Sequence, residues 1–368
     1  MRPALAGLLG GMLDKGVVTA LMVPCRQPHK NTVMQTLVTD PAMLDRADPF
    51  APVVPTNSAR LVAALTHNGA APVAAVVRSC EARAFLELVK LNQGSTEHLL
   101  LIGIDCLGRY ETRDYLSLAE QDDDVGMTFL KSAGNGGGTK SALGTDVAVA
   151  CRMCEHPVAE PVDVRLCTIG ADPTKSLWVE WVTDKGKEAC GKLGMPAQEA
   201  EPDGRTAAVK ALVDARLAFK TARLDAMRER TKDITGVTEV LASCINCYNC
   251  RVACPVCYCR ECVFLTDTFR HDGEQYLRWA LNRGKLKLPT DTVFYHMTRM
   301  LHMSTLCVGC GQCTSACPND IPVGELFRSV AGPAQARFAY QPGRSLEDKQ
   351  PLAVFYAEEF DDVTGQVK

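Results

Sequence analysis

The chain has 368 residues, 46% hydrophobic and 23% charged, so it is long enough for two or three globular domains with buried cores. Its formal net charge is −3 and no basic stripe with interleaved aromatic residues is present, so no nucleic-acid partner is expected. No run of about 20 apolar residues is available to cross a membrane. The 18 cysteines are the unusual feature. At this chain length they indicate metal ligands in a cytoplasmic protein rather than the disulfides of a small secreted domain.

The first segment is apolar but interrupted by Asp14 and Lys15, and no cleavage site is evident, so we interpret it as a core helix rather than a signal peptide. Its leucine and methionine residues recur at helical spacing until Gly16. Residues 17–23, 71–77 and 99–104 have the composition of buried strands, and residues 82–91 have helical periodicity. This order predicts an α/β domain with a largely parallel sheet over residues 1–195.

Two cysteines follow neighbouring strands of that sheet. Cys80 comes after the second expected strand and Cys106 after the third. Because the carboxyl ends of parallel strands meet at one edge, the two thiols can lie side by side there. The pair Cys151 and Cys154 can complete a tetrahedral set of four, which we call set C. From the spacing alone, buried apolar thiols without a metal remain the alternative.

The glycine-rich stretch SAGNGGGTK, residues 132–140, can cradle a phosphate, but it lacks the strand–turn–helix setting of a nucleotide-binding fingerprint. We expect a flexible surface loop there. Residues 196–243 are predicted to be a linker followed by one long helix with a solvated charged face. Residues 331–368 contain few core-forming side chains and are expected to form an extended C-terminal tail.

The spacing Cys-x2-Cys-x2-Cys-x3-Cys-Pro occurs twice, at residues 244–255 and 307–318. It is the pattern of bacterial two-cluster ferredoxins, in which the fourth thiolate of each motif binds the other cluster. Residues 244–330 are therefore expected to form an α+β or mainly helical domain with two [4Fe–4S] clusters. Gly309 and Gly311 allow the backbone N–H groups to approach the sulfur atoms. The crossed pairing gives two predicted ligand sets, set A with Cys244, Cys247, Cys250 and Cys317, and set B with Cys307, Cys310, Cys313 and Cys254.

Structural zinc is the alternative for these motifs, although zinc sites usually combine two Cys-x2-Cys knuckles separated by a longer loop. Three further cysteines, Cys257, Cys259 and Cys262, are either candidate ligands of another centre, with Cys167 or Cys190 as a fourth, or buried thiols. We favour buried thiols. Cys25, Cys167 and Cys190 individually fit core packing. His296 and His302 are expected to pack or form hydrogen bonds near a cluster rather than to ligate it.

The whole chain resembles the beta subunits of deazaflavin-dependent hydrogenases and formate dehydrogenases. The resemblance rests on LLGGMLDKGVV, RSCEARAFLELVKL, GIDCLG and CRMC, and its last part, CINCYNCRVACPVCYCREC with HMSTLCVGCGQCTSACP, is closest to the formate dehydrogenase type. It implies that set C holds a third [4Fe–4S] cluster. It also implies FAD beside that cluster and a partner catalytic subunit.

The flavin segments depart from this pattern. Relatives that bind flavin have a glycine pair before the first helix, where this chain has Arg2, Pro3 and Ala4. Their later glycine-rich segment corresponds to CTIGADPTKS, in which Gly170 persists and is the one residue we assign to FAD.

Together these features predict a cytoplasmic iron–sulfur electron-transfer subunit of a multisubunit oxidoreductase. It would relay electrons between set C and the two ferredoxin-type clusters and on to catalytic dehydrogenase, hydrogenase or heterodisulfide-reductase-like subunits. The sequence offers no acid–base or nucleophile constellation, so no catalytic residue is assigned. The alternatives are a flavin-containing subunit that itself oxidises or reduces a deazaflavin or nicotinamide, and a zinc-stabilised scaffold without a redox role.

Overall fold

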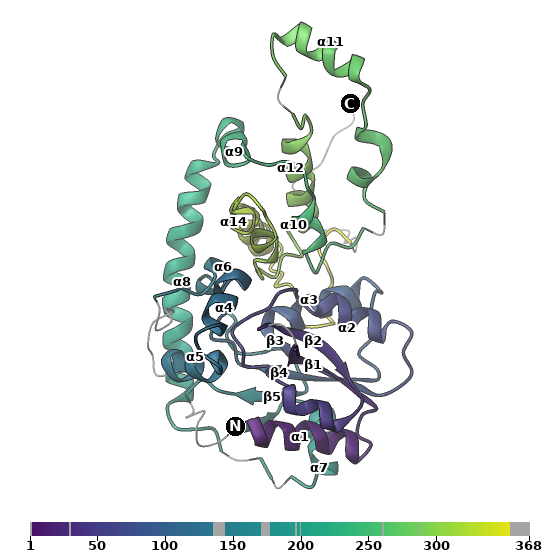
Figure 1. Cartoon of the computed structure of the whole chain (residues 1–368), viewed down its shortest axis with the longest axis vertical. Helices are drawn as coiled ribbons and strands as arrows, with labels where there is room; N and C mark the ends of the chain where they lie inside the picture. The colour runs from purple at the N-terminus through teal and green to yellow at the C-terminus, as the bar shows by residue number, and fades with distance from the viewer. Residues whose placement is uncertain are drawn as a thin grey trace.

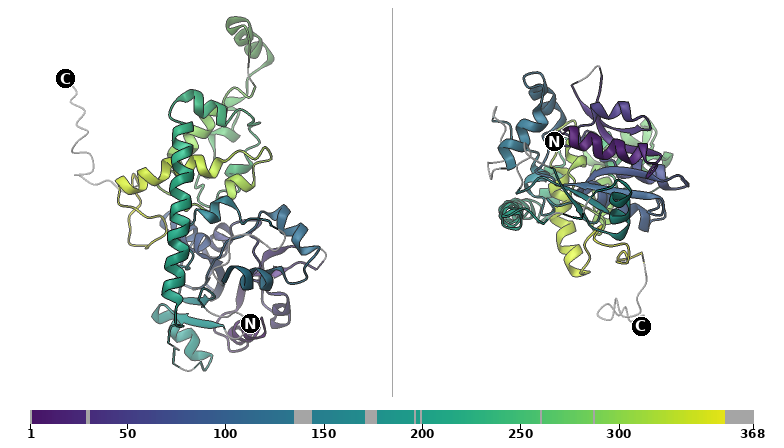
Figure 2. Two further views of the ribbon diagram at one scale, coloured as in Figure 1. Left: turned by 90° about the vertical axis from the view of Figure 1, so that its left-hand side faces the viewer. Right: turned by 90° about the horizontal axis from the view of Figure 1, so that it is seen from below.

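The computed structural model describes residues 2–28, 31–134, 144–170, 177–195, 197–198, 200–259, 261–286 and 288–353. An α/β domain forms one half of the molecule and a mainly helical domain the other (Figure 1). Helix α8 (Arg205–Arg230) runs alongside both halves, and Figure 2 shows it as the long vertical helix. Residues 135–143, which include most of the glycine-rich stretch 132–140, and residues 354–368 at the end of the chain lie outside the described residues. The expectations for them stay predictions.

A six-stranded sheet with the order β2-β1-β3-β4-β5-β6 lies at the centre of the α/β domain. Its inner strands β1 (Ala20–Arg26), β3 (Val73–Arg78), β4 (Leu99–Ile104) and β5 (Val164–Cys167) run parallel to one another. The edge strands β2 (Val33–Val38) and β6 (Trp178–Trp181) pair antiparallel with β1 and β5. The predicted α/β class is thus confirmed as a mixed sheet, parallel at its centre but not at its edges.

Helices cover both faces of the sheet, and this explains the apolar runs in the sequence. All six residues of β3 are buried. Ala74 and Val76 belong to the core that contains α1 (Arg2–Asp14). Ala75 and Val77 belong to the core on the opposite face, together with Phe85 of α3 (Ser79–Lys90). Because successive strand residues point to opposite faces, a strand covered on both sides is apolar at nearly every position, and β3 departs from this only at its last residue, Arg78.

The remaining helices complete the two halves. Around the sheet lie η1 (Pro41–Arg46), α2 (Ala59–Thr66), α4 (Thr112–Ala119), α5 (Val125–Gly134), α6 (Val149–Arg152) and α7 (Asp184–Lys192). The C-terminal half contains α9 (Ile234–Val240), α10 (Asn249–Val252), η2 (Val263–Leu265), η3 (Asp267–Phe269), α11 (Gly273–Arg283), α12 (Thr292–Met303), α13 (Gln312–Ser315) and α14 (Val323–Arg337). None of the described helices combines the length and apolar character needed to span a membrane.

The chain after α14 returns to the α/β domain. The carboxylate of Glu87 on α3, which is 0% exposed, accepts hydrogen bonds from the Tyr340 hydroxyl (2.7 and 2.8 Å), the Gly343 N–H (2.7 Å) and the Gln350 side-chain amide (2.8 Å). The Lys90 ammonium lies 3.2 Å from the same carboxylate. Residues 340–350, within the range expected to be an extended tail, therefore form a strap that is bound to α3. The buried carboxylate of Glu87 accepts hydrogen bonds from the polar groups of this strap.

Removing this carboxylate should loosen the strap. We predict that Glu87→Ala lowers the free energy of unfolding by about 3–5 kcal/mol, since it leaves a buried ammonium and several buried donors unpaired. Denaturant titration of the anaerobically purified chain measures this change. Glu97→Ala is the matched control, because the Glu97 side chain is 77% exposed and its loss should cost less than about 0.5 kcal/mol. Equal effects of the two substitutions would contradict the prediction.

Candidate metal centres

Both cysteine motifs fold into the same loop. In the first, Asn246 and Tyr248 have left-handed backbone angles (φ 51° and 60°), and in the second Gly309 and Gly311 occupy the equivalent positions (φ 74° at both). Each loop leads directly into a one-turn helix, α10 or α13. The shared conformation turns three thiols of each motif toward one side of the loop, as the spacing predicts.

Glycine in the second loop leaves room for groups that approach it closely from both domains. A Cβ atom on Gly311 would lie 2.2 Å from the Cβ of Ala150 on α6, and one on Gly309 would lie 3.0 Å from the Arg328 guanidinium of α14. The two left-handed residues of the first loop have side chains beside Asp291 on the inserted segment. The Asn246 amide donates to Asp291 (2.9 Å), and the Tyr248 hydroxyl lies 3.4 Å from the same carboxylate.

The thiols line two cavities in the crossed arrangement. One cavity is lined by all four cysteines of set A, Cys244, Cys247, Cys250 and Cys317. The other, of about 320 Å³, is lined by all four cysteines of set B, Cys254, Cys307, Cys310 and Cys313. Each motif thus contributes three thiols to one cavity and its fourth to the other. This grouping is the one that two cubane clusters require, and an uncrossed grouping does not match the lining of either cavity.

Set C lies at the carboxyl edge of the sheet. Cys80 is in the first turn of α3, Cys106 follows β4, and Cys151 and Cys154 are in and just after α6. Burial raises the pKa of Cys80 well above its usual value, and the neighbouring Cys106 and Cys154 raise it further. The buried Arg216 of α8 joins the two halves of the set, because its guanidinium donates to the carbonyls of Cys106 and Cys154 (3.3 Å each).

Sets B and C are neighbours. Cys310 of set B contributes to the raised pKa of Cys80. The buried Arg109 guanidinium lies between the two sets, because it interacts with both Cys151 and Cys310. It also donates to the Ser315 hydroxyl of α13 at 2.6 Å. The α/β domain and the C-terminal domain therefore meet at their cysteines.

Six arginines, each at most 9% exposed, surround the three sets: Arg78, Arg83, Arg109, Arg216, Arg299 and Arg328. Within the described part of the chain, only Arg109 and Arg328 of these six lie within ion-pair distance of a carboxylate, Glu111 and Glu155 respectively. The other four donate to backbone carbonyls and thiols. Buried positive charge needs a negative partner. Iron–sulfur clusters with four thiolates carry net negative charge, so the donor set fits such a group.

The thiols, once they are thiolates, also need a nearby positive charge. Burial raises the pKa of Cys254 to about 11 and that of Cys310 to about 12, with nearby thiols adding to both shifts. Without metal these groups are protonated, whereas metal ligation requires the thiolate. Metal binding at set B therefore has to release protons, and the buried arginines favour the resulting anionic state.

The inserted helix α12 supplies residues that the sequence did not single out. Its buried face carries Arg299 and Tyr295, whose polar atoms lie 3.1 and 3.3 Å from the Cys250 sulfur. His296 was expected near a cluster, and its Nε2 lies 3.3 Å from the Cys244 sulfur; burial lowers the pKa of this imidazole to about 4. His302 instead packs beside the Tyr258 ring, at 6.0 Å between centroids. In the sequence, the position of Arg299 three residues after His296 on the same predicted helix could have indicated that both side chains share one helix face.

Comparison with known proteins agrees with this geometry. Residues 240–321 match the family model for a 4Fe-4S dicluster domain. The chain is 24% identical to the F420-dependent formate dehydrogenase subunit beta of Methanocaldococcus jannaschii, over 92% of this chain and 91% of that protein. It is 26% identical to the F420-dependent formate dehydrogenase 1 subunit beta of Methanococcus maripaludis, over 95% and 92%. The predicted resemblance to the formate dehydrogenase beta type is confirmed.

A chain from the F420-reducing [NiFe] hydrogenase complex of Methanosarcina barkeri is a structural neighbour with 14% identity and a TM-score of 0.43, covering 63% of this chain and 86% of that one. The formate dehydrogenase beta subunits, by contrast, are similar to this chain along nearly its whole length, including the dicluster domain.

The three extra cysteines of the dicluster domain lie together, since Cys259 and Cys262 both contribute to the raised pKa of Cys257, after its burial. Within the described part of the chain, no three His, Cys, Asp or Glu side chains are placed to hold a single metal ion.

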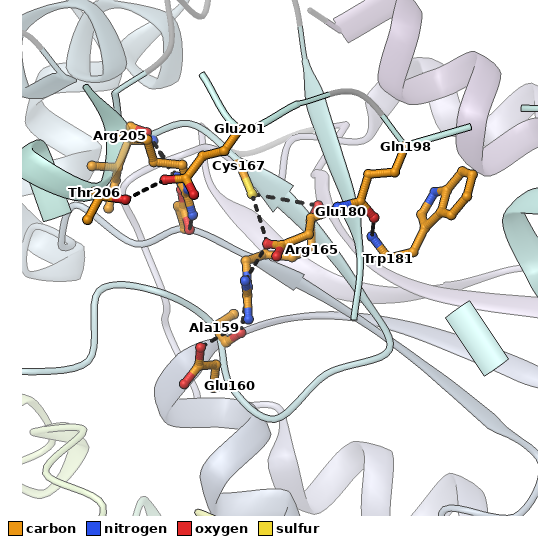
Figure 3. A network of polar contacts seen from close by, with 12 residues as sticks. Ala159, Glu160, Arg165, Cys167, Glu180, Trp181, Gln198, Glu201, Arg205 and Thr206 are labelled. Carbon is orange, nitrogen blue, oxygen red and sulfur yellow. Dashed lines mark hydrogen bonds and ion pairs between the residues drawn. The ribbon is translucent and has the colours of Figure 1, made fainter. Parts of the chain in front are cut away.

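The suggested fourth ligands lie elsewhere. The Cys167 sulfur lies 3.9 Å from the Glu180 carboxylate and from the carbonyl of Arg165, within the polar network shown in Figure 3. Cys190 belongs to the apolar core on the α1 side of the sheet, and so does Cys25. Neither Cys167 nor Cys190 joins the three extra thiols.

The structure explains why glycine occurs at position 170. Its φ is +75°, and a Cβ atom there would lie 2.5 Å from the Cα of Arg205 at the start of α8. Arg205 is buried and pairs with Asp105 (3.1 Å). The close approach that glycine permits at this position is therefore used by helix α8 of the same chain. The next residues, 171–176, lie outside the described residues.

The crossed arrangement predicted for sets A and B can be tested directly. Cys254→Ser should disturb the same cluster signal as Cys313→Ser, because both substitutions remove a thiolate from set B. Cys317→Ser should disturb the other signal, together with Cys250→Ser. Paramagnetic resonance spectra of the anaerobically reduced variants make the comparison. An uncrossed arrangement would instead group Cys254→Ser with Cys250→Ser.

Proposed function

We propose that this chain is an iron–sulfur electron-transfer subunit of a cytoplasmic, multisubunit oxidoreductase. In this proposal, set C holds one [4Fe–4S] cluster in the α/β domain and sets A and B hold two in the dicluster domain. The similar proteins are named as beta subunits of formate dehydrogenases, which supports a role beside a separate catalytic subunit.

The observation that carries the proposal is the continuity of the thiols. Set C adjoins set B through Cys80 and Cys310, and set B adjoins set A because both motifs contribute to both cavities. A [4Fe–4S] cluster bound at each set supplies a group that gains and loses one electron. The series extends from the carboxyl edge of the sheet to the exposed Cys247 of set A.

The chain's own residues have three tasks in this proposal. They surround the cluster at set B, since residues of α6, α12 and α14 line that cavity together with the four cysteines. They balance the negative charge of the clusters with the buried arginines around the three sets. They also provide an end at which a partner can approach, because Cys247 is exposed while Cys250 is buried. We assign no substrate chemistry to the chain, and the partner subunit supplies it.

The metal content tests this proposal first. Anaerobically purified protein is expected to contain about twelve iron and about twelve acid-labile sulfide atoms per chain, four of each for every [4Fe–4S] cluster. Zinc in place of iron would reject the electron-transfer proposal and favour the scaffold. About eight of each would leave the dicluster domain loaded and reject a cluster at set C.

The flavin content is tested separately. Because Arg205 takes the approach that Gly170 permits, we expect no flavin to be released when the purified protein is heated. Fluorescence of the supernatant measures this. One flavin per chain would support the flavin-containing subunit instead, and activity of the isolated chain with a deazaflavin or nicotinamide would then decide whether it is an enzyme.

A further inference from the structure

Helix α12 lies across both cavities of the dicluster domain. Tyr295, Arg299 and Met303 recur every four residues, so they share one face of the helix. Tyr295 and Arg299 contact Cys250 of set A, whereas the Met303 sulfur lies 3.7 Å from the sulfur of Cys254 in set B. The segment inserted between the two motifs thus touches the ligands of both sets.

Arg299 is the charged residue of that face. Its guanidinium donates to the sulfur and to the carbonyl of Cys250, at 3.1 Å each, and it also lines the cavity of set B. Arginine keeps its positive charge in proteins, and the Arg299 guanidinium interacts electrostatically with Cys254 and Cys313 of set B as well as with Cys250 of set A. The positive charge is permanent and is shared by thiols of both sets.

The surroundings of Arg299 concentrate this charge on the thiols. The side chain is 5% exposed, and its guanidinium lies 4.9 Å from the Phe327 ring centroid and 5.6 Å from that of Tyr295. Within the described part of the chain, no carboxylate lies within ion-pair distance of it. Salt and water therefore screen the interaction little, and the negative partner of the charge must be the metal–thiolate groups.

We propose that Arg299 is a positioning residue that raises the reduction potentials of both clusters of the dicluster domain by placing one buried positive charge between them. This inference rests on the proposed function, because it requires clusters at sets A and B. Reduction adds an electron to a group that is already negative, so a fixed nearby cation stabilises the reduced form more than the oxidised form. The effect is largest at set A, which Arg299 contacts directly.

The test compares three variants of the full-length protein, each loaded with clusters under anaerobic conditions. Arg299→Met removes the charge and keeps much of the volume. Arg299→Lys keeps the charge but loses the two-pronged contact with Cys250. Met297→Leu is the control, since it alters an exposed side chain (49%) of the same helix without changing charge. Redox titration followed by paramagnetic resonance gives the midpoint potential of each cluster.

For Arg299→Met we expect the ratio of reduced to oxidised set A cluster, at a fixed solution potential, to fall at least tenfold, a negative shift of about 59 mV for one electron. The set B cluster should shift in the same direction by less, and the set C cluster should not shift. Arg299→Lys should shift set A by less than half as much, and Met297→Leu should leave all three potentials unchanged.

Two results would overturn this inference: unchanged potentials at sets A and B in Arg299→Met, or equal shifts in Arg299→Met and Met297→Leu. If Arg299→Met fails to assemble its clusters, Arg299→Gln and Arg299→Lys take its place, and equal potentials in those two variants would overturn it as well. Iron and sulfide analysis of the unaltered protein separates these outcomes from a failure of the proposed function, which would show as missing clusters before any substitution.

Discussion

The structure depends on the burial of charge where its two domains meet. Set C lies at the carboxyl edge of the sheet and adjoins set B of the dicluster domain, and buried arginines cross that junction. The Arg83 guanidinium of α3 donates to the Val308 carbonyl (3.3 Å), and Arg328 of α14 donates to the Met153 carbonyl (3.2 Å). Cations in such positions destabilise a fold unless anionic groups accompany them. The metal–thiolate groups that we propose are therefore part of what holds the domains together.

This constraint also explains local features that are costly in isolation. Tyr248 adopts a left-handed backbone angle that bulky residues avoid, and its ring packs on Tyr295 with 4.8 Å between centroids. His296 is buried as a neutral imidazole beside the Cys244 sulfur. Both residues lie at the contact between the first cysteine loop and α12. The strain there is maintained because it orients the thiols of set A.

Much of this architecture can be predicted from the sequence, for identifiable reasons. The strands at 73–78 and 99–104 are apolar at nearly every position because both faces of the sheet are covered, and the two ferredoxin-type motifs have a spacing with few other uses. The antiparallel edge strands and the strap that Glu87 binds depend on long-range contacts that local patterns do not encode. Arg299 and the other buried arginines resemble surface charges in the sequence, since their burial follows from long-range contacts, between the domains for Arg83 and Arg328 and within the dicluster domain for Arg299.

The central claim is that the chain holds three separate iron centres. Each of the two cysteine motifs gives three thiols to one centre and its fourth thiol to the other. Anomalous scattering at the iron edge from an anaerobically grown crystal tests it most directly. The account predicts three peaks, one bounded by Cys80, Cys106, Cys151 and Cys154, and one at which Cys254 joins Cys307, Cys310 and Cys313. A peak in which Cys254 joins Cys244, Cys247 and Cys250, or scattering at the zinc edge in place of the iron edge, would contradict it.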